Sequence, residues 1–184
     1  PAYAASLLAS KGYEVFWLDG IAEKLIYEEW LKKIMEVKPD IIAIETKTPV
    51  IKYHWKIIDR LKKLSPNTYN LSTVLMGDHV TAFPEESMKN CPVDFVITGG
   101  DYDFGLLSIA NYLSKGEKLE AGIWHRESQK SKVKSQKFNS KFKSYSNTGK
   151  FTLSHSLDEL PMIDRNLTRW ELYSHKNSNF YRAP

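Results

Sequence analysis

Cysteine is nearly absent from this chain of 184 residues, which contains only Cys91. A single thiol excludes an internal disulfide, a zinc site built on cysteines, and an iron–sulfur cluster held by these residues alone. The sequence has no run of about 18 apolar residues and no visible signal peptide, so we predict no membrane segment and expect a cytoplasmic location. Neither a Gly-x-Ser-x-Gly elbow nor a Walker loop occurs, and no spacing of Ser, His and Asp singles out a catalytic triad.

Acidic residues are absent from one segment. Residues 128–150 hold seven Lys and no Asp or Glu, so the net charge of +4 has a local origin. Apart from Phe138, Phe142 and Tyr145 the segment lacks the interleaved aromatics that stack on bases, which disfavours nucleic-acid binding. We expect a solvated loop or a hairpin here.

Strand and helix patterns alternate along the first two thirds of the chain. Strands are predicted at 14–18, 40–44, 73–76 and 93–97, and helices at 1–11, 27–37, 50–64, 85–89 and 104–113. This alternation predicts an α/β fold with a doubly wound, flavodoxin-like (Rossmann-like) parallel sheet and helices on both faces. Such sheets normally open on a strand, so we expect a first strand before Pro1, seated between 14–18 and 40–44. Beyond Gly116, short strands are expected at 122–126 and 151–155.

Polar turns follow the predicted strands, and the carboxyl ends of parallel strands are where ligands bind in open α/β sheets. Glycine there lets a ligand approach the backbone. The candidate ligand-binding residues are Asp19, Gly20, Thr46, Thr48, Gly77, Asp78, His79, Val80, Thr98, Gly99, Gly100 and Asp101. A plainer interpretation stays open: the three Asp side chains cap turns or helices, Gly77 only forms a turn, and His79 is a solvated loop residue.

Several stretches together resemble the cobalamin-binding domain of B12-dependent radical S-adenosylmethionine enzymes, a group that includes relatives of the anaerobic magnesium-protoporphyrin ester cyclase. The most specific is Gly77-Asp-His-Val-Thr-Ala-Phe-Pro-Glu-Glu86, which has the pattern Gly-x-His-x-Thr-x-x-Pro-Glu-Glu. Residues 1–15, Leu18-Asp19, 39–43 and 93–100 follow the same order, and Leu157–Arg165 resembles the "LDxLPxxDR" bridge into the radical domain. The resemblance covers most of residues 1–113 and residues 157–184.

The chain departs from the family pattern in three places. It has Gly77-Asp78 where the family commonly has Gly-Gly, and Asp101 stands one position beyond the usual Glu. The cluster motif Cys-x-x-x-Cys-x-x-Cys is missing, and in the family it would lie beyond Pro184.

The resemblance implies a cobalamin-binding domain at 1–118, a basic hairpin extension at 119–156, and a linker at 157–184 toward a radical domain of the same chain. The partner domain would carry a [4Fe-4S] cluster and S-adenosylmethionine. A small-molecule substrate would lie between the domains and undergo methyl transfer or radical rearrangement. Residues 1–184 alone would not be catalytic, and we expect His79 to contact the corrin rather than ligate cobalt. The alternative is a non-enzymatic doubly wound module, either a receiver-type or a nucleotide-binding regulatory domain.

Overall fold

The computed structural model describes residues 1–64, 70–126, 144–173, 175–177 and 180–182. The chain forms two compact units, Pro1–Pro39 with His155–Pro184, and Asp40–Ser154. The three-part division at 118 and 156 stays a prediction. Within the described ranges, no helix is long and apolar enough to cross a membrane.

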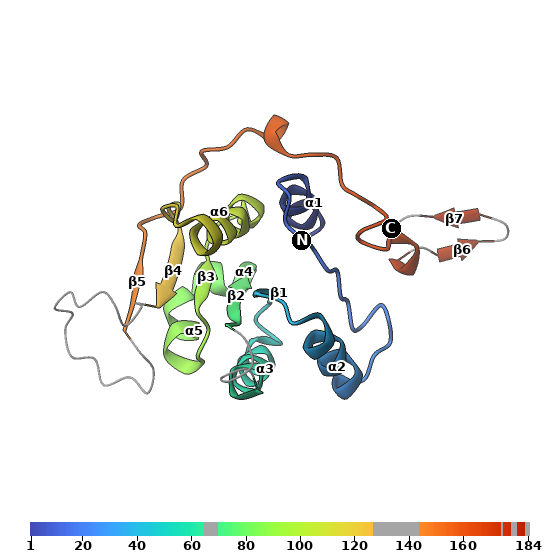
Figure 1. Ribbon diagram of the computed structural model, residues 1–184, viewed down its shortest axis with the longest axis horizontal. Helices are drawn as coiled ribbons and strands as arrows, with labels where there is room; N and C mark the ends of the chain where they lie inside the picture. Colours follow the sequence, from blue (N-terminus) through green and yellow to red (C-terminus); the bar gives the residue numbers. More distant parts are fainter. Residues whose placement is uncertain (65–69, 127–143, 174, 178–179, 183–184) are drawn as a thin grey trace. The chain divides into compact units, whose positions relative to one another are not determined.

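The larger unit is built on a five-stranded mixed sheet in the order β1-β2-β3-β4-β5 (Figure 1). Its strands are β1 (Ile41–Glu45), β2 (Ser72–Met76), β3 (Phe95–Ile97), β4 (Ile123–Arg126) and β5 (Tyr145–Asn147). The first three are parallel, and β4 and β5 are antiparallel to their neighbours. The α/β class is therefore confirmed, and the expectation of a wholly parallel sheet is wrong for the outer two strands.

The direction of β4 follows from the path of the chain after α6 (Tyr102–Lys115). Residues 117–121 turn back along this helix, where the Glu120 N–H donates to Ser108 Oγ at 2.9 Å. They return the chain to the carboxyl edge of β3, where the Thr98 N–H donates to the Gly122 carbonyl. The next strand must then run antiparallel to β3.

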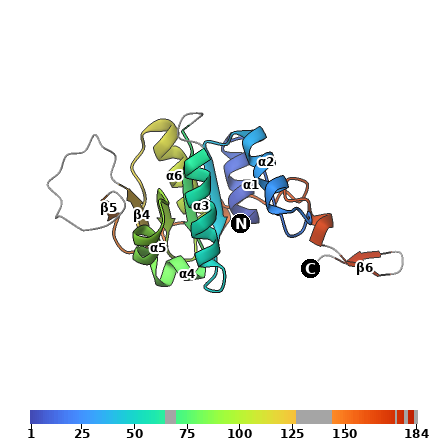
Figure 2. The ribbon, with the colours of Figure 1, turned by 90° about the horizontal axis from the view of Figure 1, so that it is seen from below.

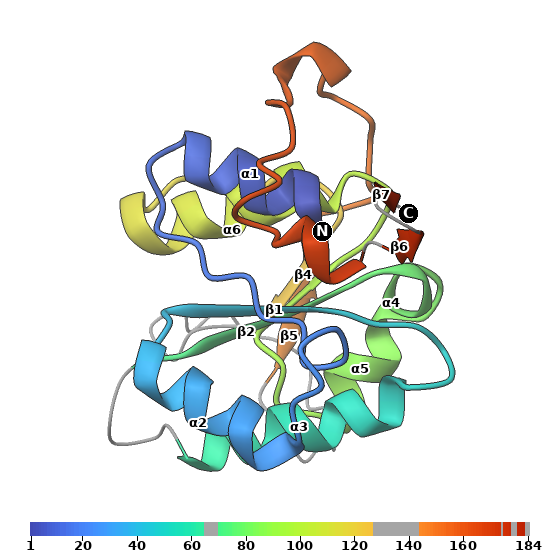
Figure 3. The ribbon, with the colours of Figure 1, turned by 90° about the vertical axis from the view of Figure 1, so that its right-hand side faces the viewer.

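Helices cover both faces of this sheet. In Figures 1 and 3, α3 (Ile51–Leu64) and α5 (Pro84–Asn90) lie on one face and α6 on the other, and in Figure 2 α3 and α5 lie in front of the sheet. The connections from β1 to β2 and from β2 to β3 step across the sheet in the same direction. Because crossovers between parallel strands are right-handed, α3 and α5 then lie on the same face. Val74 and Leu75 on β2 are neighbours that point to opposite faces, and both are fully buried, as expected for a central strand covered on both sides.

Residues 14–18 do not form the predicted strand in this structure. Their apolar residues suit a strand, but a strand also needs a hydrogen-bonding neighbour, and none of the described residues pairs with them. On the described sheet β1 pairs only with β2 and is an edge strand. A further strand beside β1 stays a prediction.

The smaller unit contains α1 (Ala2–Ser10), α2 (Tyr27–Val37), two 3₁₀ helices, η1 (Leu157–Glu159) and η2 (Trp170–Tyr173), and a hairpin of β6 (His175–Asn177) and β7 (Phe180–Arg182). The predicted helices at 1–11 and 27–37 are confirmed. Gly12 follows α1 with a φ of +87°, a conformation that favours glycine where a helix ends.

Two local predictions need correction. The polar turn expected after Gly77 contains a short helix, α4 (Asp78–Ala82). The strand that returns beside β4 was expected at 151–155 and lies earlier in the chain, as β5 at Tyr145–Asn147. β5 ends before Gly149, whose carbonyl accepts from the Gly122 N–H, and Phe151 beyond it packs against Gly122. The lysine-rich residues 127–143 lie outside the described residues, between the paired strands β4 and β5.

The contact of α6 with β3 yields a first prediction. A Cβ added at Gly105 would lie 2.7 Å from Ile97 Cγ2, so Gly105→Ala must push the helix off the strand. We expect this variant to lower the free energy of unfolding by about 1–3 kcal/mol, measured by urea denaturation. The same substitution should cost less in an Ile97→Ala background, and an equal cost in both backgrounds would show that this contact is not limiting.

Candidate functional site: a pocket at the carboxyl edge of the sheet

A pocket of about 450 Å³ opens between the turns that follow β2 and β3. Because these strands are parallel, both turns lie at the carboxyl edge of the sheet. The lining residues are Gly77, Asp78, Thr81, Ala82, Gly99, Gly100 and Tyr102. Four of them are sequence candidates, whereas Thr81, Ala82 and Tyr102 are not.

Gly77 makes a close contact within the protein. Its φ is +110°, and a Cβ at this position would lie 2.6 Å from the Thr46 carbonyl oxygen. The neighbouring Thr46 N–H donates to the Met76 carbonyl at 2.8 Å. Gly77 therefore lets the turn after β2 lie directly against the turn after β1.

The Thr46 side chain points into the protein, because the residue is only 1% exposed. Its hydroxyl lies 2.9 Å from His54 Nδ1 on α3. Burial lowers the pKa of His54, which favours a neutral imidazole. Thr46 thus holds the turn after β1 against α3 and does not line the pocket.

His79 is 5% exposed and links three elements. Its Nδ1 lies 3.2 Å from the Thr48 hydroxyl, and its Nε2 lies 3.2 Å from a carboxylate oxygen of Glu86 on α5. Its ring contacts those of Trp55 and Phe83. A carboxylate only accepts, so Nε2 carries a proton and donates to Glu86. Both ring nitrogens thus have partners inside the chain.

Thr81 joins the two turns that flank the pocket. Its hydroxyl donates to the Gly77 carbonyl at 3.0 Å and accepts from the Gly99 N–H at 3.2 Å. The first contact lies within α4, and the second crosses from α4 to the turn after β3. Thr81 belongs to the motif quoted from the sequence, which was the signal that could have identified it.

Gly99 is pressed against an aromatic ring on the side where a side chain would project. Its φ is +93°, and an added Cβ would lie 2.3 Å from Phe151 Cγ. The Thr98 hydroxyl beside it donates to the Gly122 carbonyl at 2.7 Å. Phe151, beyond β5, and Gly122, just before β4, therefore both contact the turn after β3. The Thr98 hydroxyl makes the bond to Gly122.

The open part of the pocket is formed by Gly100, Asp78 and Tyr102. No described atom lies within 4 Å of a Cβ added at Gly100, and Asp78 is exposed. Burial raises the pKa of the Tyr102 hydroxyl, and the nearby Glu45, Asp103 and Asp78 raise it further. The phenol therefore keeps its proton and can donate a hydrogen bond to a ligand.

The remaining candidates of this unit have structural positions. Val80 is fully buried in the core, and Asp101 is the N-cap residue of α6. Within the motif, Pro84 opens α5, and Glu85 accepts from the Tyr145 hydroxyl at 2.8 Å. Four residues of the motif, Gly77, Asp78, Thr81 and Ala82, thus line the pocket, and His79 and Val80 are buried beside them.

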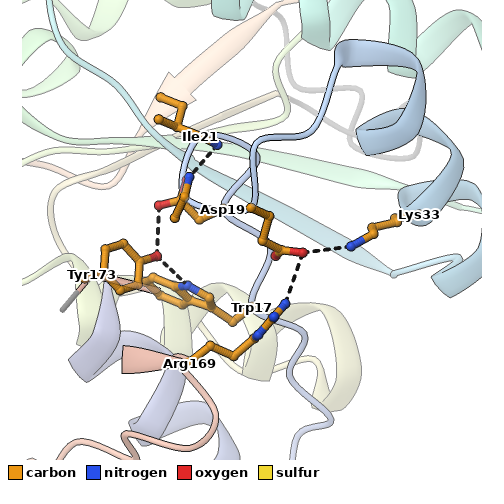
Figure 4. A network of polar contacts seen from close by, with 8 residues as sticks. Trp17, Asp19, Ile21, Lys33, Arg169 and Tyr173 are labelled. Carbon is orange, nitrogen blue, oxygen red and sulfur yellow. Dashed lines mark hydrogen bonds and ion pairs between the residues drawn. The ribbon is translucent and has the colours of Figure 1, made fainter. Parts of the chain in front are cut away.

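Asp19 and Gly20 belong to the smaller unit. Asp19 Oδ1 accepts from the N–H groups of Ile21 and Ala22, both at 3.0 Å, and Oδ2 accepts from the Tyr173 hydroxyl at 2.9 Å (Figure 4). The same hydroxyl accepts from Trp17 Nε1. Asp19 is thus a turn cap that is also bonded to η2.

Glu23 forms the second polar link in this unit, with a side chain only 6% exposed. Its Oε2 lies 2.7 Å from Lys33 Nζ and 3.0 Å from Arg169 Nη1 (Figure 4). The hydrogen bond from Lys33, with the charges of both cations, lowers the pKa of Glu23. Together these contacts hold residues 169–173 against residues 17–33.

In the described ranges, no three His, Cys, Asp or Glu side chains lie close enough together to hold a metal ion. Cys91 is buried, and burial raises its pKa to about 12. It is therefore a thiol at neutral pH and has the character of a core residue.

The two adjacent glycines of the turn after β3 should respond differently to substitution. Gly99→Ala meets Phe151 and keeps a positive φ, so we expect it to lower the free energy of unfolding by at least about 2 kcal/mol. Gly100→Ala meets nothing within 4 Å and should stay within about 0.5 kcal/mol of the wild type. Thermal or urea denaturation measures both, and equal effects would contradict this assignment of the two positions.

Comparison with known proteins finds two relatives. The chain is 29% identical over 131 residues to an uncharacterized methyltransferase of Pyrococcus horikoshii, covering 70% of this chain and 28% of that protein. It is 28% identical over 116 residues to the anaerobic magnesium-protoporphyrin IX monomethyl ester cyclase of Rubrivivax gelatinosus, covering 62% of this chain and 20% of the cyclase. No family model and no solved structure matches. The chain is thus distantly related, over part of its length, to a methyltransferase and a cyclase, and spans less than a third of either.

Proposed function

We propose that this chain is the cobalamin-binding part of a B12-dependent radical S-adenosylmethionine enzyme. Its larger unit would belong to a doubly wound domain that holds part of the cofactor in the pocket between Gly77 and Gly100. A radical domain of the same chain would carry the [4Fe-4S] cluster and S-adenosylmethionine. The complete enzyme would act on a small molecule by methyl transfer or radical rearrangement.

The observation that supports this proposal most is the place of the family-like motif in the fold. Residues Gly77–Glu86 form the turn, α4 and the start of α5 beside the pocket, at the edge where α/β sheets bind ligands. The two relatives, one named a methyltransferase and the other a cyclase, agree with the resemblance read from the sequence.

The pocket residues fit a large, amide-rich cofactor. Four of the seven lining residues are Gly or Ala, so backbone groups on the two turns are accessible beside the side chains of Asp78, Thr81 and Tyr102. Tyr102 can donate to a neutral amide oxygen of such a cofactor. A pocket of about 450 Å³ would take one part of a corrinoid rather than the whole. The cofactor, when bound, would supply the methyl-transfer or radical chemistry, and this chain its position.

The regulatory alternatives have less support. No Lys or Arg is among the pocket-lining residues of the described chain, and Asp78 in the pocket, with Glu45 and Asp103 near Tyr102, would repel nucleotide phosphates. A receiver domain would place a Lys after its last parallel strand, but β3 is followed by Thr98-Gly99-Gly100.

Titration of the intact protein with hydroxocobalamin, followed by its visible spectrum, tests the proposal. We expect saturable binding that weakens about ten-fold or more in Gly100→Leu, because Gly100 lines the pocket and a Cβ there meets no atom beyond its chain neighbours, so the new side chain would occupy space proposed for the cofactor. Gly100→Ala should lie between the two, and unchanged thermal unfolding is the control. No binding by the wild type would refute the proposed function, and unchanged binding by Gly100→Leu would place the cofactor elsewhere.

His79 should not ligate cobalt, because both of its ring nitrogens already have partners and the residue is 5% exposed. Electron paramagnetic resonance of the cob(II)alamin-loaded protein reports a nitrogen ligand directly. The spectrum of His79→Gln should match that of the wild type. Nitrogen splitting present in the wild type and lost in the variant would contradict this assignment.

A further inference from the structure

The two walls of the pocket belong to different turns, and a single side chain bonds both. The Thr81 hydroxyl donates to the Gly77 carbonyl on one wall and accepts from the Gly99 N–H on the other. A threonine hydroxyl offers one donor and two acceptor positions, so it can make both bonds at once. Valine has the same shape but neither bond, whereas serine retains both.

The Gly99 turn is supported from opposite directions. The Phe151 ring lies where a Cβ of Gly99 would project, and the preceding residue is fixed by the bond from the Thr98 hydroxyl to the Gly122 carbonyl. Thr81 ties this turn to α4, since the Gly99 N–H donates to its hydroxyl. Gly100 follows at the open part of the pocket, so its place depends on how Gly99 is held.

We propose that Thr81 is the positioning residue of this pocket. Its hydroxyl sets the separation of the Gly77 and Gly99 turns and thereby the fit of the ligand between them. The identity of that ligand as cobalamin rests on the proposed function. The effect requires the hydroxyl itself and not the bulk of the side chain.

The test compares Thr81→Val with Thr81→Ser in the intact protein, with Thr81→Ala as a second variant that removes the hydroxyl. The first measurement needs no ligand: amide hydrogen exchange in a peptide that contains Gly99. We expect exchange to quicken about five-fold or more in Thr81→Val, because a bonded amide becomes free, and to stay within about two-fold in Thr81→Ser.

The second measurement is the dissociation constant for hydroxocobalamin. We expect about a ten-fold increase in Thr81→Val and Thr81→Ala, and a change within about two- to three-fold in Thr81→Ser. The rescue by serine separates a positioning hydroxyl from general loss of packing, since serine lacks the methyl group of threonine.

Three outcomes would overturn the proposal. Unchanged Gly99 exchange in both Thr81→Val and Thr81→Ala would show that the hydroxyl does not hold the turn. Faster exchange with unchanged affinity would show that the separation of the turns does not govern binding. Equal losses in Thr81→Ser and Thr81→Val would assign the effect to packing. If the wild type fails to bind hydroxocobalamin, the proposed function fails, and the exchange measurement alone decides whether Thr81 holds the turn.

Discussion

The close approach of Gly77 to the backbone of Thr46 is the constraint on which the carboxyl edge depends. Any side chain at Gly77 would meet the Thr46 carbonyl oxygen at 2.6 Å, and the φ of +110° is one that other residues rarely adopt. With the two turns in contact, Thr46 can bond His54, Thr48 can bond His79, and α4 can begin directly after Gly77. The hydroxyl of Thr81 then lies within reach of the next turn along the sheet. On the side where a side chain would project, Gly77 makes room for the protein itself, and the pocket that it also lines opens between this turn and the turn after β3.

The sequence predicted most of the larger unit because its elements carry their own local signals. The helix at 50–64 and the strands at 40–44 and 73–76 were predicted within a residue or so of α3, β1 and β2, because helical periodicity, strand runs and capping residues are local properties. The failures concern pairing. A strand at 14–18 needs a neighbour, and the antiparallel direction of β4 depends on how residues 117–121 pack along α6. Neither is visible in the segment itself.

The pocket lies at the sheet edge where the sequence placed the candidate residues, and it is lined by four of them, whereas ligand binding there stays a prediction. Residue types that bind ligands at strand ends also cap turns and bridge loops, since Thr, Asp and His offer the same hydrogen-bonding groups to both. Asp19 caps its own turn and accepts from Tyr173, Thr98 bonds the Gly122 carbonyl, and His79 is buried between Thr48 and Glu86. Tyr102 was missed because an aromatic residue at a helix start has no distinctive spacing, and its position on the pocket appears only once the turn after β3 is placed.

Four of the seven residues that line the pocket are Gly or Ala, so the proposed selectivity depends strongly on the residues that hold their turns in place. Glycine and alanine offer few distinguishing side-chain contacts, so shape and the direction of N–H and carbonyl groups must select the ligand. The Thr81 hydroxyl bonds both turns and the ring of Phe151 packs against Gly99, and these are the contacts that we propose set those properties. The negative charges of Glu45, Asp78 and Asp103 near Tyr102 also disfavour a ligand with an anionic group close to the phenol. A motif can therefore mark such a candidate site although only four of its residues line the pocket, because others, such as His79 and Val80, are buried and support the turn and helix from which those four project.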